Sequence, residues 1–275
     1  MDWDHLHRYL LRTLEELTSV EEAQAEARLW IEDGYGHNLA WLALHGKDSV
    51  DEKIQRQLDI WIERRKKGEP CQYLWGRTQF RGRFFRCDDR VLIPRPETEL
   101  VIEEALSRRL SSASMRVWDV GTGSGIIGIT LALETQWTIT VSDLSSKALD
   151  CAQENAHDHQ IQLKFVQSDL LQACTDSLDM VIANLPYLSP LIRNQLQPEL
   201  HFEPSQALFA EDAGYALVER LLKEGWDHQV PLMILEIGHD QANQLKRIAK
   251  KIGWPHVQTT RDWNGFDRVL VVEKP

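Results

Sequence analysis

The residues in this chain best suited to chemistry form one tetrapeptide, Asn184, Leu185, Pro186 and Tyr187. It follows the apolar run 178–182, which is typical of a buried parallel strand. The Asn side chain offers an amide oxygen. The proline keeps the residue before it extended, so the Leu185 carbonyl can serve as a second acceptor. The Tyr ring adds a flat wall. Two acceptors and a wall suit a planar –NH2 group, either an amide or an exocyclic amine.

A second motif, rich in glycine, joins a predicted strand at 116–120 to a predicted helix at 124–134. Its alternating glycines let the backbone turn sharply and let a ligand lie directly against it. A dinucleotide fingerprint reads G-x-G-x-x-G, whereas the G-x-G-x-G spacing here fits a nucleoside amino acid better than a pyrophosphate. We therefore expect a cofactor site made by Asp119, Gly121, Thr122, Gly123, Ser124 and Gly125.

Two further acids follow predicted strands. Asp143 ends the strand at 138–142, where a carboxylate can accept hydrogen bonds from both hydroxyls of a ribose. Ser145 just beyond is a good N-cap, so capping chemistry is the alternative explanation for an acid here. Asp169 follows the next strand and can accept from an adenine amino group, while Leu170 packs on the ring.

These motifs need a scaffold that brings strand ends together. From about residue 95, strands alternate with helices, which is typical of a parallel sheet with helices on both faces. The expected strands are 116–120, 138–142, 162–167, 178–183, 231–237, 256–260 and 268–273, and the expected helices are 97–110, 124–134, 146–157, 214–225 and 240–252. No helix separates the last two strands, which predicts a closing hairpin and one antiparallel strand. All the motifs lie at carboxyl ends of strands, where such sheets bind ligands.

Residues 1–70 predict a small bundle of helices, with capping boxes at 19–22 and 49–52 marking two helix starts. After the bundle, residues 80–84 alternate around Gly82 and predict a β-hairpin that joins it to the α/β region. Arginines cluster there, either as the polar face of the hairpin or as a basic surface for an acidic or RNA-like partner. They are Arg77, Arg81, Arg83, Arg86 and Arg90.

The charge and composition of the chain limit the kinds of partner and metal that it is expected to bind. The net charge is −11, with −2 in residues 1–90 and −9 in residues 91–275, so direct binding to nucleic acid is not expected. The four cysteines lack a CxxC spacing and the histidines lack HExxH, so neither a disulfide framework nor a metal is expected. No apolar run approaches a membrane span and the acidic N-terminus does not resemble a signal peptide, which predicts a cytoplasmic protein without membrane contact.

Together, the glycine loop, the strand-end acids and the Asn-x-Pro-aromatic element resemble the class I S-adenosylmethionine-dependent methyltransferases. A narrower resemblance, to the HemK/PrmC family of peptide chain release factor N5-glutamine methyltransferases, covers about residues 68–275. The helical region matches more by architecture than by sequence. The strings that carry the resemblance are Gly68-Glu69-Pro70, Gln72-Tyr73-Leu74, Phe80 with Gly82, Val91 to Leu100, Glu203-Pro204, Ala207-Leu208, Gly214, Leu235 to Gly238, Asp262, and Gly265 to Arg268.

The resemblance implies an α/β fold with a Rossmann-like, seven-stranded, mostly parallel sheet. It divides the chain into a helical substrate-binding domain (1–70), a hairpin linker (71–94) and a methyltransferase domain (95–275). It also implies S-adenosyl-L-methionine as cofactor, S-adenosyl-L-homocysteine as product, and no metal. The implied substrate is a class 1 peptide chain release factor, methylated on the side-chain nitrogen of the glutamine in its Gly-Gly-Gln motif.

On this resemblance, the Asn184 oxygen and the Leu185 carbonyl accept the two amide N–H bonds of that glutamine, and Tyr187 walls its side chain. Asn184 is also expected beside the cofactor. The family usually has Asn-Pro-Pro-Tyr, whereas Leu185 stands here in place of the first proline. Asn-Leu-Pro-Tyr also resembles the form in rRNA adenine dimethyltransferases, so an adenine-N6 methyltransferase acting on nucleic acid is the alternative function.

The string from Pro94 to Leu100 is expected to support the site, with Arg95, Glu97 and Glu99 ordering the loop beside the cofactor. A simple helix start at Pro96 would also explain it. A third hypothesis is a non-catalytic adaptor that binds a partner through its helical region. The intact cofactor loop and amine pocket argue against it.

Overall fold

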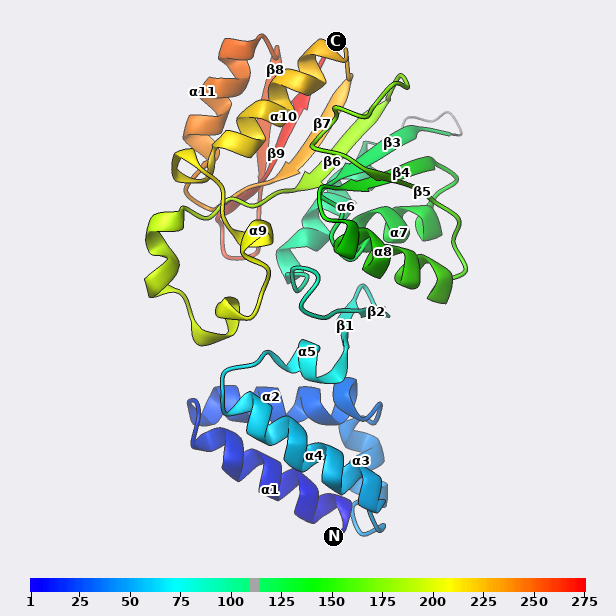
Figure 1. The fold of residues 1–275 in the computed structure, drawn as a ribbon, viewed down its shortest axis with the longest axis vertical. Helices are drawn as coiled ribbons and strands as arrows, with labels where there is room; N and C mark the ends of the chain where they lie inside the picture. Colours follow the sequence, from blue (N-terminus) through cyan, green and yellow to red (C-terminus); the bar gives the residue numbers. More distant parts are fainter. Residues whose placement is uncertain (109–113) are drawn as a thin grey trace.

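The computed structural model describes residues 1–108 and 114–275 and shows an N-terminal bundle of helices beside an α/β domain (Figure 1). The helices of the bundle are α1 (Trp3–Glu15), α2 (Val20–Leu29) with a following π-helical turn (Trp30–Gly34), α3 (Leu39–His45), α4 (Glu52–Arg65) and α5 (Cys71–Trp75). Their apolar faces share one core, in which Leu6, Trp30 and Leu58 are fully buried. The predicted helical bundle is confirmed.

Side-chain caps start the helices of the bundle. The Ser19 hydroxyl accepts from the backbone N–H of Glu22 and the Glu22 carboxylate accepts from that of Ser19, which confirms the first capping box. The second predicted box is wrong. Asp51, not Ser49, caps α4, through a 2.6 Å hydrogen bond from the backbone N–H two residues on. Ser49 instead forms a β-bridge with Asp2, and the backbone N–H of the following residue, Val50, donates to the Met1 carbonyl.

The α/β domain contains a seven-stranded sheet in the described part of the chain, in the order β5-β4-β3-β6-β7-β9-β8. Its strands are β3 (Arg116–Val120), β4 (Thr138–Asp143), β5 (Lys164–Gln167), β6 (Met180–Asn184), β7 (Leu232–Glu236), β8 (His256–Arg261) and β9 (Asp267–Glu273). β9 runs antiparallel to both of its neighbours, and the other described pairs are parallel. The predicted α/β fold, with its mostly parallel sheet and its antiparallel strand, is confirmed.

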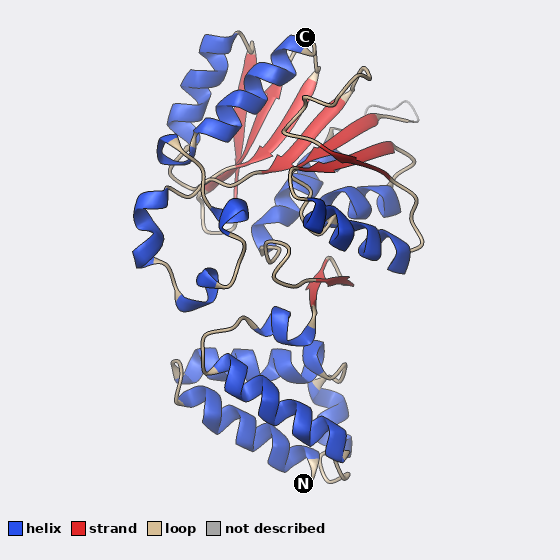
Figure 2. Ribbon diagram, viewed as in Figure 1, coloured by secondary structure: helices blue, strands red, loops and turns tan. Residues whose placement is uncertain are grey.

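Helices cover both faces of this sheet (Figure 2). The first face carries η2 (Pro96–Thr98), α6 (Glu99–Ser107), α7 (Ile126–Glu134) and α8 (Ser146–Asp158), and the second carries α10 (Ala216–Asp227) and α11 (Ala242–Ile252). In β6, Val181 packs into the core on the second face and Ile182 into the core on the first, so this central strand is buried on both sides. Of the helix predicted at 97–110, residues 109 and 110 lie outside the described residues.

One long connection lies between β6 and α10. Its elements are η3 (Pro190–Gln195), η4 (Pro198–His201), α9 (Ser205–Leu208) and η5 (Asp212–Gly214). The Arg65 guanidinium, at the end of α4, joins this connection to the helical bundle. It donates to Glu26 of α2 at 2.8 Å and to Glu199 of η4 at 2.9 Å. The long connection therefore touches the bundle directly.

The predicted hairpin is present as β1 (Arg77–Phe80) and β2 (Arg83–Arg86). Arg81 and Gly82 make its turn with φ angles of 46° and 73°, typical of a two-residue hairpin loop. The clustered arginines of this region have partners inside the chain. These are the Asp33 carbonyl for Arg77, Glu134 for Arg81 and Arg83, Asp158 for Arg86, and Asp88 with Glu154 for Arg90. These contacts favour the polar-face interpretation over a basic partner surface.

The predicted segment boundaries, 1–70, 71–94 and 95–275, remain predictions. α5, which falls in the predicted linker, packs into the core of the bundle through Cys71 and Leu74. In residues 1–108 and 114–275, no helix is long and apolar enough to cross a membrane. A cytoplasmic location also remains a prediction.

Candidate active site

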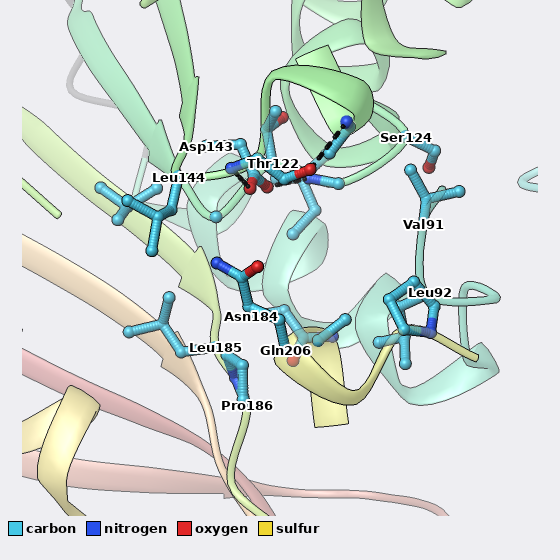
Figure 3. Close-up of a pocket in the computed structure, with 18 of the residues that line it drawn as sticks. Val91, Leu92, Thr122, Ser124, Asp143, Leu144, Asn184, Leu185, Pro186 and Gln206 are labelled. Atoms are coloured by element: carbon cyan, nitrogen blue, oxygen red, sulfur yellow. Dashed lines mark hydrogen bonds between the residues drawn. The ribbon is translucent and has the colours of Figure 1, made fainter. Parts of the chain in front are cut away.

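A cavity opens at the carboxyl ends of β3, β4 and β6, where the strand order reverses (Figure 3). It brings together most of the residues expected from the sequence: Gly121, Thr122, Gly123, Ser124, Asp143, Asp169, Leu170, Asn184, Leu185 and Pro186. The remaining expected residues lie outside its lining: Asp119, Gly125, Tyr187, Arg95, Glu97 and Glu99. Val91 and Leu92 line the side of the cavity opposite Leu185, and Gln206 of α9 lines it near Asn184 (Figure 3).

The glycine loop is shaped by positive φ angles of 69°, 54° and 79° at Gly121, Gly123 and Gly125. A Cβ on Gly121 would lie 2.9 Å from a methyl group of Leu185, and one on Gly125 would lie 2.9 Å from Ile129. A Cβ on Gly123 would meet no atom within 4 Å. The outer two glycines therefore permit close packing, whereas the middle one borders open space in the cavity.

Asp119 lies beneath this loop and is fully buried. Its Oδ2 accepts hydrogen bonds from the Thr122 hydroxyl at 2.6 Å and the Gly128 backbone N–H at 3.0 Å, while its Oδ1 has no hydrogen-bond partner among the described residues. Burial raises the pKa of Asp119 to about 7, against these two hydrogen bonds. Asp119 therefore shapes the loop from below rather than lining the cavity.

Asp143 joins the glycine loop to α8. Its Oδ2 accepts from the backbone N–H of Gly123 at 3.0 Å and its Oδ1 from that of Ser145 at 2.9 Å. The cap of α8 is the Ser145 hydroxyl, which accepts from the Ala148 N–H. Capping therefore does not account for Asp143. Each carboxylate oxygen has two lone pairs, so both retain capacity for a hydroxyl donor.

Asp169 and Leu170 line the far end of the cavity. Asp169 Oδ2 accepts from the guanidinium of Arg220 at 2.9 Å. Leu170 is buried and has a φ of 51°, and its carbonyl accepts from the Ser168 hydroxyl at 2.9 Å. This contact holds a conformation that a leucine rarely adopts and keeps the side chain against the cavity. The predicted adenine contacts remain predictions.

Asn184 ends β6, and its side chain points into the cavity toward the glycine loop (Figure 3). Its Nδ2 donates to the Thr98 hydroxyl at 3.2 Å, and that hydroxyl donates to Glu236 Oε2 at 2.7 Å. Sequence reasoning did not select Thr98 or Glu236 as site residues. The available signal was an acid at the end of the apolar strand predicted at 231–237, since a charged residue there needs a buried partner.

Tyr187 is not among the residues that line the cavity. Its carbonyl accepts from the Gln241 side chain at 3.2 Å, and burial raises the pKa of its hydroxyl. Leu185 and Pro186, rather than this ring, line the cavity beside Asn184. The predicted wall role of Tyr187 therefore stays a prediction and draws no support from its position here.

The predicted supporting loop is held by ion pairs. Arg95 donates to Glu203 Oε1 at 2.5 Å, and Glu203 Oε2 accepts from the backbone N–H of Ile93 at 3.0 Å. Glu97 lies 3.8 Å from Arg268 and Glu99 lies 3.9 Å from Arg81. Pro96 also begins η2, as the alternative explanation predicted. In residues 1–108 and 114–275, no group of three or more His, Cys, Asp or Glu side chains is placed to hold a metal.

A mostly parallel seven-stranded sheet with one antiparallel strand, a glycine loop after β3 and an Asn-x-Pro-aromatic element after β6 define a class I methyltransferase. Solved structures support this class at the level of fold. A methyltransferase from Pyrococcus furiosus has a TM-score of 0.54 and 13% identity over 81% of this chain and 98% of its own. The ribosomal protein L11 methylase of Lactobacillus delbrueckii subsp. bulgaricus has a TM-score of 0.51 and 17% identity over 70% and 86%.

Family comparisons are more specific. Residues 6–76 match the PrmC N-terminal domain and residues 98–209 match the methyltransferase small domain. A release factor glutamine methyltransferase from Lactococcus lactis subsp. lactis is 35% identical over 86% of this chain and 89% of its own length. Another, from Koribacter versatilis, is 36% identical over 86% of each. The chain belongs to the family of release factor glutamine methyltransferases.

Proposed function

We propose that this protein methylates the side-chain amide nitrogen of the glutamine in the Gly-Gly-Gln motif of class 1 release factors, with S-adenosyl-L-methionine as the methyl donor. The orientation of Asn184 carries the proposal. Its NH2 group is bound to Thr98, so its oxygen is the atom left to accept from a planar amide in the cavity. The names of the relatives in the same family support the substrate.

The cavity fits the cofactor. Gly123 leaves room for a ligand against the backbone, and Asp143 keeps lone pairs for the ribose hydroxyls. Asp169 and Leu170 would flank the adenine. When bound, the cofactor supplies an electrophilic methyl group on a sulfonium sulfur. The S-adenosyl-L-homocysteine product would occupy the same residues.

An amide nitrogen is a poor nucleophile, because its lone pair is delocalised into the carbonyl. The protein would compensate for this weak nucleophilicity by holding the amide nitrogen in a fixed position. The Asn184 oxygen and the Leu185 carbonyl would accept its two N–H bonds and fix the direction of attack, which is a proximity and orientation effect. We assign no general base, and the proton would leave after transfer. Glu236 is only 2% exposed and is hydrogen-bonded to Thr98, which keeps it out of the cavity.

The presence of Leu185 in place of the family's usual proline does not require an adenine substrate. Its side chain is buried against Gly121, where a Cβ would come within 2.9 Å of it, so it packs under the glycine loop. The internal pairing of the clustered arginines also offers no specific support for nucleic acid as a substrate. We further propose that the helical bundle contributes to holding the release factor, because it contacts the long connection after β6 through Arg65.

The test is mass spectrometry of a purified class 1 release factor incubated with this protein and S-adenosyl-L-methionine. A methyl group on the Gly-Gly-Gln glutamine is expected. A release factor with that glutamine changed to alanine is the control, and it should stay unmethylated. Methylation of added RNA with an untouched release factor would overturn the proposal.

A further inference from the structure

A chain of three polar side chains runs from the interior of the sheet to the cavity. Glu236 ends β7 and Asn184 ends the neighbouring β6, where the two residues are register partners. Thr98, at the end of η2, lies between their side chains. Thr98 and Glu236 are each only 2% exposed, so neither can exchange its partner for solvent without local opening.

The order of donors along this chain follows from its chemistry. An ionised carboxylate only accepts, so Glu236 takes the single proton of the Thr98 hydroxyl at 2.7 Å. The Thr98 oxygen can then only accept at its remaining sites, and it faces the NH2 of Asn184 at 3.2 Å. The opposite orientation of the Asn184 amide would place oxygen against oxygen. The carboxylate thereby selects which end of the Asn184 amide turns to the cavity.

We propose that Thr98 and Glu236 are positioning residues, which hold the Asn184 amide with its oxygen toward the substrate. Thr98 lines the cavity, but its only proton is donated to Glu236 and its oxygen accepts from Asn184, while Glu236 lies outside the lining. A flipped Asn184 would present N–H bonds to the N–H bonds of the substrate amide, and that pairing is repulsive. This inference rests on the proposed function, because it assumes a substrate that donates.

Three substitutions separate this role from simple packing. Thr98→Val keeps the shape and removes the hydroxyl, Thr98→Ser keeps the hydroxyl, and Glu236→Gln keeps the size but can donate to Thr98. Thr130→Val is the matched control. Thr130 is a buried threonine of α7 whose hydroxyl has no hydrogen-bond partner among the described residues, and it does not line the cavity.

The first readout is kinetic. Thr98→Val and Glu236→Gln should lower kcat for release factor methylation by about 10- to 100-fold, since a misplaced reacting group costs up to about 100-fold. Binding of S-adenosyl-L-methionine, measured by titration calorimetry, should stay near the wild-type value. Thr98→Ser and Thr130→Val should retain most of the rate. Wild-type kcat in both Thr98→Val and Glu236→Gln would overturn the inference, as would a loss confined to cofactor binding.

The second readout needs no substrate. Hydrogen exchange of the Asn184 side-chain NH2, assigned by NMR with an Asn184→Asp reference, should show one slowly exchanging proton in the wild type and in Thr98→Ser. In Thr98→Val both protons should exchange rapidly. Equal exchange in the wild type and Thr98→Val would overturn the inference even if the protein proved inactive. Wild-type protein that leaves the release factor unmethylated, but shows the protected proton, would refute only the proposed function.

Discussion

The Oδ2 atom of Asp143 accepts a hydrogen bond of 3.0 Å from the backbone N–H of Gly123. A carboxylate at the end of β4 thus holds the middle glycine of the loop after β3, and both residues line the cavity. This contact therefore fixes the glycine loop against the end of β4 within the cavity.

Asp143→Ala should weaken binding of S-adenosyl-L-methionine. It removes the acceptors for the ribose and releases the glycine loop. A charged hydrogen bond contributes about 2 kcal/mol, so the dissociation constant should rise roughly 30-fold or more. Titration calorimetry measures it. Asp143→Asn keeps one acceptor oxygen, so its dissociation constant should lie between those of the wild type and Asp143→Ala. Unchanged affinity in Asp143→Ala would contradict the assignment of Asp143 to the cofactor.

Asn184→Ala should abolish turnover while leaving cofactor binding nearly intact. The substrate amide loses its acceptor, and a loss of at least about 100-fold in kcat is expected from misplacement of the nitrogen. Methylation of the release factor is followed by mass spectrometry, and cofactor binding by calorimetry. A variant that loses only affinity for the cofactor, and keeps the wild-type kcat at saturating cofactor, would contradict the role of Asn184 as the acceptor for the substrate amide.

Gly121→Ala should lower stability more than Gly123→Ala does. Both changes place a side chain at a positive φ, which costs about 1–3 kcal/mol. Only the first also brings a Cβ within 2.9 Å of Leu185. Thermal unfolding of the two variants isolates the packing contribution. Equal losses would mean that Leu185 moves aside without cost.

Arg95→Met should destabilise the protein by about 3 kcal/mol, because it leaves the carboxylate of Glu203 buried without its cation. The double variant with Glu203→Gln should recover part of this loss, since the buried charge is then gone. Urea unfolding of the two single variants and the double variant gives the coupling free energy between Arg95 and Glu203. Strictly additive losses would show that the pair does not act as a unit.

The rate of methylation should fall as pH is lowered through about 7. Burial raises the pKa of Glu236 to about 7. The groups that face it are Thr98, Glu97, Arg268, Arg95 and Tyr187. Once protonated, Glu236 can donate to Thr98 and no longer orders the Asn184 amide, so activity is present above this pKa and lost below it. Single-turnover rates against pH test this, and Glu236→Gln should lack the acid limb near pH 7.

Three motifs between Gly121 and Pro186 show how much short stretches of sequence can predict. Alternating glycines after a strand, an acid at a strand end and a Pro two residues after an Asn are set by a few neighbouring residues. The sequence alone therefore determined the sheet, its antiparallel strand and the part of the cavity lining that includes Gly123, Asp143 and Asn184. It also indicated the family, through strings such as the one from Val91 to Leu100.

Tertiary structure decided which way the side chains point and what they meet. Asp119 is buried under the loop and neither it nor Tyr187 lines the cavity, although both belong to the predicted motifs. Thr98, Asn184 and Glu236 come from three separate elements, and no local pattern joins them. Hydrogen bonds between distant residues depend on how helices and strands pack. That packing is a property of the whole core, so only the folded chain specified the orientation of Asn184.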